Sequence, residues 1–410
     1  MALLGIPLLV VLACAAVLAP VATLLLWSRV RGPRPVRGGL RLGMLWTGQL
    51  ATVLLVAALA NDYGQFYTSW ADLFGTAGGH PTVATYGAPL NGGRHGHPGV
   101  AALPDRAGRP HHPHQRPQAR PTPSTPPQPV TGHLRVLGPN SWSTRAQWHT
   151  RGKVESVRIT GLRSGLSVHA FVYLPPQYFS PQYAHHQFPA VEVLTGYPGS
   201  ALNLVSRMNY PQIALTDVRQ HRSVPMVYVM LSSTVAPPRD TECTDVPGGP
   251  QAETFLASEL PSAVQAALRV QPGHWGIVGD STGGYCAAKI TMYDRAVFAG
   301  GVSLSGYYFA REDPTTGNLW GGSLARQHRN DLEWTLAHRP APPVSLMVTT
   351  ARTETRFDGY PDALKFLHLV KPPMRVTALI EPTGGHNFAT WDAELPRALH
   401  WLSARITARP

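Results

Sequence analysis

Gly279-Asp-Ser-Thr-Gly283 matches the pattern G-x-S-x-G, in which a serine stands on a sharp turn between a strand and a helix. Residues 274–278 before it include Trp, Ile and Val and predict a short buried strand, while residues 284–292 after it predict a helix. The two glycines, Gly279 and Gly283, allow neighbouring backbone to pass close to the turn. The stretch therefore predicts a nucleophile elbow, with Ser281 projecting above the end of a sheet.

The same stretch, extended by Gly284, also resembles the serine loop of chymotrypsin-like proteases. Those enzymes place the histidine and the aspartate before the serine and are built on antiparallel barrels. In this chain the best partners for Ser281 come after it, in the order serine, acid, histidine. That order is typical of an α/β-hydrolase.

A serine hydroxyl is a weak nucleophile at neutral pH and needs a general base. The best candidate is His386, which lies in the glycine-rich loop 382–388, just after the apolar run 376–380. The glycines let this loop fold over the end of the sheet and bring the imidazole to Ser281. The competing interpretation is an ordinary loop histidine.

The acid that orients the histidine is expected after a strand between Ser281 and His386. The apolar run 344–349 leads into a turn that carries Glu354 and Asp358. Glu354 lies closer to the strand end and is the preferred acid, with Asp358 as the alternative. A buried carboxylate there would hold the tautomer of the imidazole and stabilise the imidazolium. For either residue, the competing interpretation is a solvated acid of the turn.

An oxyanion hole needs two backbone N–H groups. One is expected from Thr282, the residue after the nucleophile, and the other from a loop after an early strand. The loop 195–199 follows such a strand, and Tyr197 is its candidate donor because Pro198 has no N–H.

From about residue 132 onward, short apolar runs alternate with stretches that favour helix. The expected strands are 156–160, 166–174, 190–194, 226–231, 274–278, 301–305, 344–349 and 376–380, and a helix is expected over 253–270. This alternation predicts an α/β fold with a mostly parallel central sheet covered by helices on both faces. Ligands of such sheets bind beyond the carboxyl ends of the strands, where Ser281 is expected.

Two hydrophobic segments precede everything else. Residues 2–27 and 42–60 contain no charged side chain, and a bilayer core needs about 20 residues of helix. Five arginines lie within 28–41, and the positive-inside rule places such a loop in the cytoplasm. We therefore predict two transmembrane helices in a multi-pass cell-membrane protein, with the C-terminal domain on the extracytoplasmic side. The alternative, a cleaved signal peptide over 1–27, is disfavoured because the segment lacks a basic start.

The composition divides the chain into three parts. Residues 1–77 form the predicted membrane anchor with its interfacial segment, 78–131 a disordered linker, and 132–410 the α/β-hydrolase domain. The linker holds 12 of the 40 prolines and six of the 18 histidines, a composition that buries too little apolar area to fold. Its histidines at 111, 112 and 114 have no fixed scaffold, so no metal site is expected there.

The net charge of +12 lies mostly in the arginine loop and the linker. No folded basic stripe interleaved with aromatic residues is evident, so a nucleic-acid partner is not expected. The predicted chemistry requires no cofactor, and protein partners are unknown. Cys14 lies in the first membrane segment, and the sequence leaves open whether Cys243 and Cys286 form a disulfide. The acidic loop 240–245 is expected to be structural or to line the substrate site.

Residues 155–404 resemble the esterase D-type branch of the α/β-hydrolases, which includes the secreted actinobacterial mycolyltransferases. The segment 253–261 resembles that family's helix before the elbow. The elbow, the Glu354 segment and the loop of His386 follow in the family's order. The resemblance implies Ser281, Glu354 and His386 as a triad, with an oxyanion hole from the loop after the early strand and from the elbow. The paired hydrophobic segments resemble those of membrane-anchored actinobacterial esterases.

The departures from the family concern its sugar acceptor. The mycolyltransferases have Asp-Gly where this chain has Thr195-Gly196, an arginine where Pro198 stands, and a tryptophan where Phe388 stands. The sequence therefore favours a serine esterase that hydrolyses small-molecule or lipid carboxylic esters through an acyl-enzyme. The alternatives are an acyltransferase to a cell-envelope alcohol or sugar, and a catalytically silent binding protein.

Overall fold

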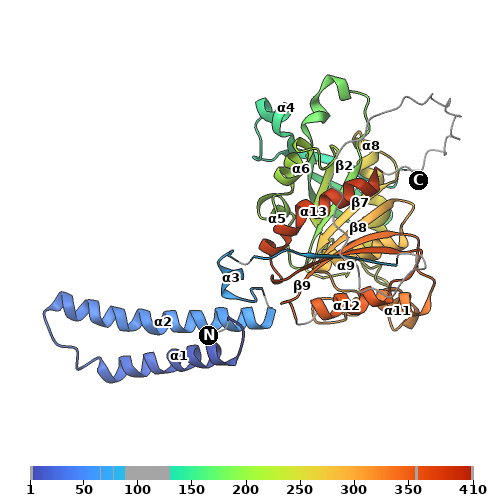
Figure 1. The fold of residues 1–410 in the computed structure, drawn as a ribbon. Coiled ribbons are helices and arrows are strands. Elements are labelled where there is room, and N and C mark those ends of the chain that lie inside the picture. The colour runs from blue at the N-terminus through green and yellow to red at the C-terminus, as the bar shows by residue number, and fades with distance from the viewer. Residues whose placement is uncertain (1–2, 65, 77, 88–129, 356–358, 408–410) are drawn as a thin grey trace, which may run out of the picture.

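The computed structural model describes residues 3–64, 66–76, 78–87, 130–355 and 359–407 (Figure 1). The linker histidines considered above and Asp358 lie outside the described residues.

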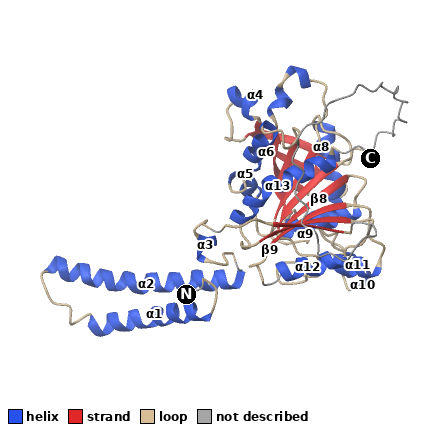
Figure 2. Ribbon diagram, viewed as in Figure 1, coloured by secondary structure: helices blue, strands red, loops and turns tan. Residues whose placement is uncertain are grey.

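One ten-stranded sheet organises the C-terminal part, with the strand order β1-β10-β9-β8-β7-β5-β6-β4-β3-β2. Figure 2 shows its strands in red, with helices packed on the sheet. The strands from β10 to β6 in that order pair in parallel, and β1, β4, β3 and β2 add antiparallel pairs at the two ends. The strands are β1 (Thr82–Tyr86), β2 (Gly132–Pro139), β3 (Lys153–Gly161), β4 (Ser167–Leu174), β5 (Ala190–Thr195), β6 (Val227–Ser232), β7 (Trp275–Asp280), β8 (Phe298–Leu304), β9 (Ser345–Ala351) and β10 (Arg375–Glu381). The predicted α/β fold with a mostly parallel sheet is confirmed.

Helices cover both faces of this sheet because successive side chains of each buried strand point to opposite sides. In β5, Ala190 and Leu194 pack on the face covered by α8, α9 and α12, whereas Val191 and Val193 pack on the face of α5, α6 and α13. The helices of this part are α4 (Trp148–Arg151), α5 (Ala201–Ser206), α6 (Tyr210–Arg219), α7 (Ala252–Thr254), α8 (Leu260–Ala267), α9 (Thr282–Tyr293), α10 (Leu324–Arg329), α11 (Leu332–His338), α12 (Tyr360–Leu369) and α13 (Phe388–Ile406).

The helix expected over 253–270 is interrupted and shorter. A π-helical turn, Phe255–Glu259, separates α7 from α8, and the helix ends at Ala267. The next residues turn extended, and Val270 forms a bridge with Phe188. This tertiary pairing ends the helix.

The expected linker contains a strand at its start. Residues 82–86 form β1, which pairs antiparallel with β10 at the edge of the sheet. Composition does not reveal this strand, because its partner is supplied by a segment almost 300 residues later. The prediction of a linker that begins at residue 78 therefore does not hold for residues 82–86, which belong to the sheet.

Two long apolar helices form the N-terminal part. α1 (Ile6–Leu26) and α2 (Arg34–Gly64) pack side by side as a hairpin (Figure 1). Each is long and apolar enough to cross a membrane, with mean hydropathies of 2.7 and 1.8, and their side chains are mostly exposed or half-buried, apart from a few such as Thr23 and Ala51. The short helix α3 (Trp70–Leu73) lies between the hairpin and the sheet domain.

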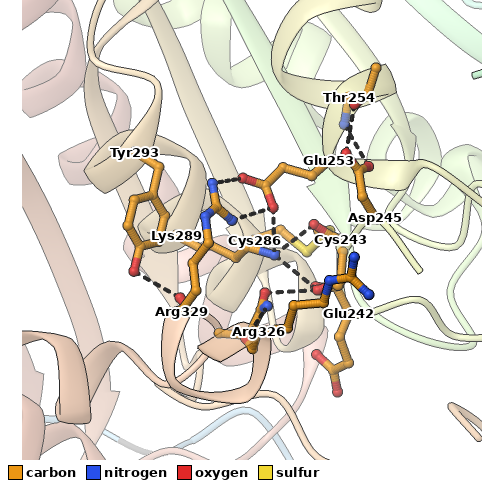
Figure 3. Close-up of polar contacts among 12 residues, drawn as sticks. Glu242, Cys243, Asp245, Glu253, Thr254, Cys286, Lys289, Tyr293, Arg326 and Arg329 are labelled. Carbon is orange, nitrogen blue, oxygen red and sulfur yellow. Dashed lines mark hydrogen bonds and ion pairs between the residues drawn. A yellow bond between two sulfur atoms is a disulfide. The ribbon is translucent and has the colours of Figure 1, made fainter. Parts of the chain in front are cut away.

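The sequence leaves open whether Cys243 and Cys286 pair. In the structure a disulfide joins them. It fixes the acidic loop against α9, the helix that follows the elbow. The buried Lys289 strengthens the attachment, because its Nζ donates to the Cys243 carbonyl at 2.8 Å and pairs with Glu253 at 3.1 Å (Figure 3). The cysteines are separated by 43 positions in the sequence, and closing this loop contributes about 4 kcal/mol by the chain-entropy model. Asp240 and Glu242 of the acidic loop are themselves buried, so the loop is packed into the domain as a structural element.

Candidate active site

The elbow places Ser281 between the end of β7 and the start of α9. Its backbone has φ 54° and ψ −123°, a positive φ that is rare for a residue with a side chain. A Cβ on Gly279 would lie 2.1 Å from the carbonyl oxygen of Gly283, and a Cβ on Gly283 would lie 2.2 Å from that of Leu194. Only glycine fits at either position, as the sequence pattern predicts.

The hydroxyl of Ser281 is the first group in a hydrogen-bonded chain. Its Oγ lies 2.8 Å from Nε2 of His386, and Nδ1 of the same ring lies 2.6 Å from Oε1 of Glu354. The Glu354 side chain is 3% exposed and that of His386 is 21% exposed. The structure thus brings together three residues from the ends of the parallel strands β7, β9 and β10. Such an arrangement is able to transfer the hydroxyl proton to the imidazole while a buried carboxylate faces the opposite ring nitrogen.

The loop of His386 is held from both sides. Thr353, next to Glu354, donates through its hydroxyl to the carbonyl of Gly384 at 2.6 Å and accepts from the N–H of the same glycine at 3.0 Å. Asn387 caps α13 by accepting from the Thr390 N–H at 2.9 Å. These bonds hold the imidazole in place without using its own nitrogens.

The loop 195–199, which carries the candidate oxyanion donor Tyr197, passes in direct contact with Ser281. A Cβ on Gly196 would lie 2.7 Å from Cβ of Ser281, so the chain approaches as closely as glycine allows. Tyr197 follows at once, and Thr282 begins α9, where helix N–H groups have no partner in the preceding turn. Within the described residues, neither of these two N–H groups donates to another protein group.

Comparison with known families decides the class of the protein. The esterase family model matches residues 163–402. The chain belongs to the esterase family. The resemblance recognised in the sequence is therefore confirmed, and the protein is a hydrolase. No curated protein matches this esterase by sequence.

Solved structures resemble the esterase in fold. An S-formylglutathione hydrolase from Agrobacterium tumefaciens has a TM-score of 0.55 at 16% identity, with 66% of this chain and 99% of that chain covered. A ferulic acid esterase has a TM-score of 0.52 at 16% identity, with 62% and 99% covered. Mycobacterium tuberculosis MPT51 (FbpC1) has a TM-score of 0.42 at 15% identity, with 59% and 95% covered. At these identities the first two likenesses bear on the fold alone.

Asp280 has a role that sequence reasoning missed. Its Oδ2 accepts from the Gly196 N–H at 3.1 Å and from the Thr195 hydroxyl at 3.2 Å, so it ties the loop after β5 to the elbow. Burial raises the pKa of the Asp280 carboxyl to about 6, against the lowering effect of these two hydrogen bonds. The only signal in the sequence is an acid directly before the nucleophile, and it does not identify the partners.

Ionisation of the buried Asp280 carboxyl is expected to make the free energy of unfolding depend on pH. Its pKa rises from 3.8 to about 6 on folding, so its ionisation costs stability as the pH rises through this window. Asp280→Asn removes the ionisation but keeps an acceptor oxygen for Gly196. We expect the free energy of unfolding of wild type to fall relative to the variant between about pH 4 and pH 7, by up to about 3 kcal/mol. Denaturant unfolding of both proteins in detergent across this range measures it, and a constant difference would contradict the assignment.

A cavity of about 990 Å³ opens at the serine of the esterase. Ser281 and His386 line it, together with Gly196, Tyr197 and Trp391 from the sheet domain. Its remaining wall includes residues of α1, α2 and the segment 66–73. The candidate site is thus bounded by both parts of the chain.

Proposed function

We propose that this esterase is a membrane-anchored, outward-facing serine hydrolase that cleaves carboxylic esters through an acyl-enzyme on Ser281. The observation that carries the proposal is the hydrogen-bonded chain from Ser281 through His386 to Glu354. It lies at the carboxyl ends of parallel strands, where ligands of such sheets bind. Membership of the esterase family supports the same chemistry.

In the first half of the reaction, Ser281 Oγ attacks the ester carbonyl carbon while His386 Nε2 takes the hydroxyl proton. Collapse of the tetrahedral intermediate breaks the bond to the alcohol oxygen, which receives that proton from His386. In the second half, His386 takes a proton from water, and the resulting hydroxide equivalent attacks the acyl carbon. Return of the proton to Ser281 Oγ releases the carboxylic acid. Glu354 accepts the hydrogen bond from the Nδ1–H of His386 and stabilises the imidazolium that forms in each half of the reaction.

The negative charge on the carbonyl oxygen needs donors that are already in place. The N–H groups of Tyr197 and Thr282 suit this role, because the Gly196 contact sets the first beside the serine and α9 presents the second. The positive end of the α9 dipole adds to the same stabilisation. Asp280 supports the geometry by fixing Gly196.

The topology of the anchor follows from its charges. All five arginines between residues 28 and 41 lie in the connection between the two helices or at the start of α2. In Figure 1 this connection lies at the end of the hairpin that points away from the sheet domain. A cytoplasmic position for it, by the positive-inside rule, places the N-terminus and the hydrolase domain outside. In this proposal residues 1–77 anchor the enzyme, and 132–410 together with β1 form its hydrolase domain.

Hydrolysis is distinguished from acyl transfer by the acceptor. We expect the full-length protein in detergent to release acid from an activated ester, p-nitrophenyl butyrate, with water as the only acceptor. Addition of trehalose or glucose is expected to leave the rate of p-nitrophenol release unchanged and to yield no acylated sugar by mass spectrometry. Release that occurs only when a sugar is present would overturn the hydrolase proposal in favour of an acyltransferase.

A further inference from the structure

The cavity at Ser281 is walled in part by the two N-terminal helices. Leu54, Ala57, Ala58 and Asn61 of α2 line it. Their spacing of three, four and seven residues puts them on one face of the helix. From α1, residues at positions 8 and 12 line it with the four-residue spacing of a single face. One face of the hairpin is thus part of the site, and the small alanines leave room in it.

The segment between α2 and β1 fixes the hairpin to the catalytic loop. Asn387 donates through Nδ2 to the Phe66 carbonyl, and the Thr68 hydroxyl donates to the Gly384 carbonyl at 2.8 Å. Gly384 and Asn387 flank His386 in the sequence. The anchor therefore contacts the loop that carries the base and is more than a tether.

The cavity wall combines polar groups of the sheet domain, such as Asp280 and Asn387, with apolar side chains of both helices and of the segment 66–73. Phe66, Trp70 and Leu73 line it from the segment after α2, and Leu54 lines it from α2 itself. Leu54 is also 46% exposed, and its neighbour Val53 is 63% exposed, on surface that the proposed bilayer would cover. A volume of about 990 Å³ is at the upper end for ligand pockets and exceeds what a short acyl group fills.

From these observations we propose that the substrate is a long-chain ester lipid of the same membrane, whose acyl chain occupies the cavity wall formed by α1, α2 and 66–73. This inference rests on the proposed esterase function and names its substrate class. An acyl chain held in water would lose about 0.8 kcal/mol per exposed methylene, so a site that takes a long chain from a membrane needs an apolar wall such as this one. A chain that arrives from the bilayer between the helices passes from one apolar environment to another, whereas a short soluble ester has too few methylenes to occupy this wall.

The test compares chain lengths in variants of α2. Ala58→Trp fills the cavity face, and the matched control Val56→Trp adds the same side chain at a residue that is 59% exposed and does not line the cavity. The full-length proteins are reconstituted in phosphatidylcholine vesicles and assayed with p-nitrophenyl palmitate and butyrate. We expect the palmitate-to-butyrate ratio of kcat/KM to fall about tenfold or more in Ala58→Trp, equivalent to the loss of about two buried methylenes. The ratio of Val56→Trp is expected to stay at the wild-type value.

Two results separate the failure of this inference from that of the proposed function. Absence of butyrate hydrolysis and of fluorophosphonate labelling in wild type would overturn the esterase proposal itself. Normal butyrate hydrolysis with an unchanged ratio in Ala58→Trp would overturn only the lipid inference. Fluorophosphonate labelling of each variant shows whether its site is folded, and Ala57→Trp provides a second cavity variant if Ala58→Trp is not labelled.

The route of entry is tested with a fluorogenic diacyl ester lipid that does not exchange between vesicles. Placed in the same vesicles as the enzyme, it is expected to be hydrolysed. Placed in separate vesicles that are then mixed with the enzyme vesicles, it is expected to remain intact. Equal hydrolysis in both arrangements would show uptake from outside the membrane and overturn lateral entry.

Discussion

Ser281→Ala is expected to lower kcat for ester hydrolysis by about 10⁴-fold to 10⁶-fold and to abolish labelling by a fluorophosphonate probe. The reason is that the hydroxyl 2.8 Å from His386 Nε2 is the proposed site of the acyl bond, and no other group in the arrangement replaces it. The residual rate over water would come from the oxyanion donors and substrate binding alone. Release of p-nitrophenol and in-gel fluorescence of the labelled protein measure the two effects.

Ser206→Ala is the control for this experiment, because Ser206 is an exposed serine of α5 whose hydroxyl donates to the Leu202 carbonyl of the same helix. It is expected to keep wild-type hydrolysis and labelling. Labelling of Ser281→Ala at the wild-type level would remove Ser281 as the nucleophile, whatever its distance from the imidazole.

Glu354→Gln is expected to lower kcat by about 10³-fold to 10⁴-fold at neutral pH. The carboxylate lies 2.6 Å from His386 Nδ1 and is buried. An amide in its place has nearly the same shape but no negative charge, and its NH₂ group favours the tautomer in which Nε2 carries the proton. That tautomer is unable to accept the proton of Ser281. Steady-state kinetics with p-nitrophenyl butyrate measure the loss, with KM expected to change little because the acid does not touch the substrate.

Asp358→Asn is the matched control, since Asp358 is the acid that the sequence offers as the alternative. It is expected to keep kcat within about twofold of wild type, because Glu354 is the residue whose carboxylate lies 2.6 Å from His386 Nδ1. A large loss in Asp358→Asn together with a small loss in Glu354→Gln would reverse the assignment of the acid.

The parts of the site that sequence reasoning could find are those with local signals. The elbow is local, because a strand, two obligatory glycines and a helix lie within about 20 residues. The candidates His386 and Glu354 follow from their positions after apolar strands, since parallel strands bring their carboxyl ends to one edge. The hydrogen bonds among Ser281, His386 and Glu354 agree with that expectation in geometry, and their catalytic roles remain predictions for the two variants above.

The parts that sequence reasoning missed depend on contacts between distant segments. Asp280 is adjacent to the nucleophile, yet its partner Gly196 is 84 residues away. β1 lies in proline-rich surroundings, and the edge of β10 provides its strand partners. The cavity wall on α2 has no motif, because an alanine that lines a cavity and one on the outer face of the helix look the same in sequence.

The sequence by itself determined the α/β class, the elbow and the order of the candidate acid and base, because the periodicity of apolar residues and the need for glycine are properties of short segments. The tertiary structure alone decided that Cys243 pairs with Cys286, that Asp280 holds the loop of Gly196, and that the two N-terminal apolar helices line the cavity at Ser281. These features arise when segments far apart in the chain meet. Their energies depend on the distance and burial of both partners, and neither partner's own sequence records them.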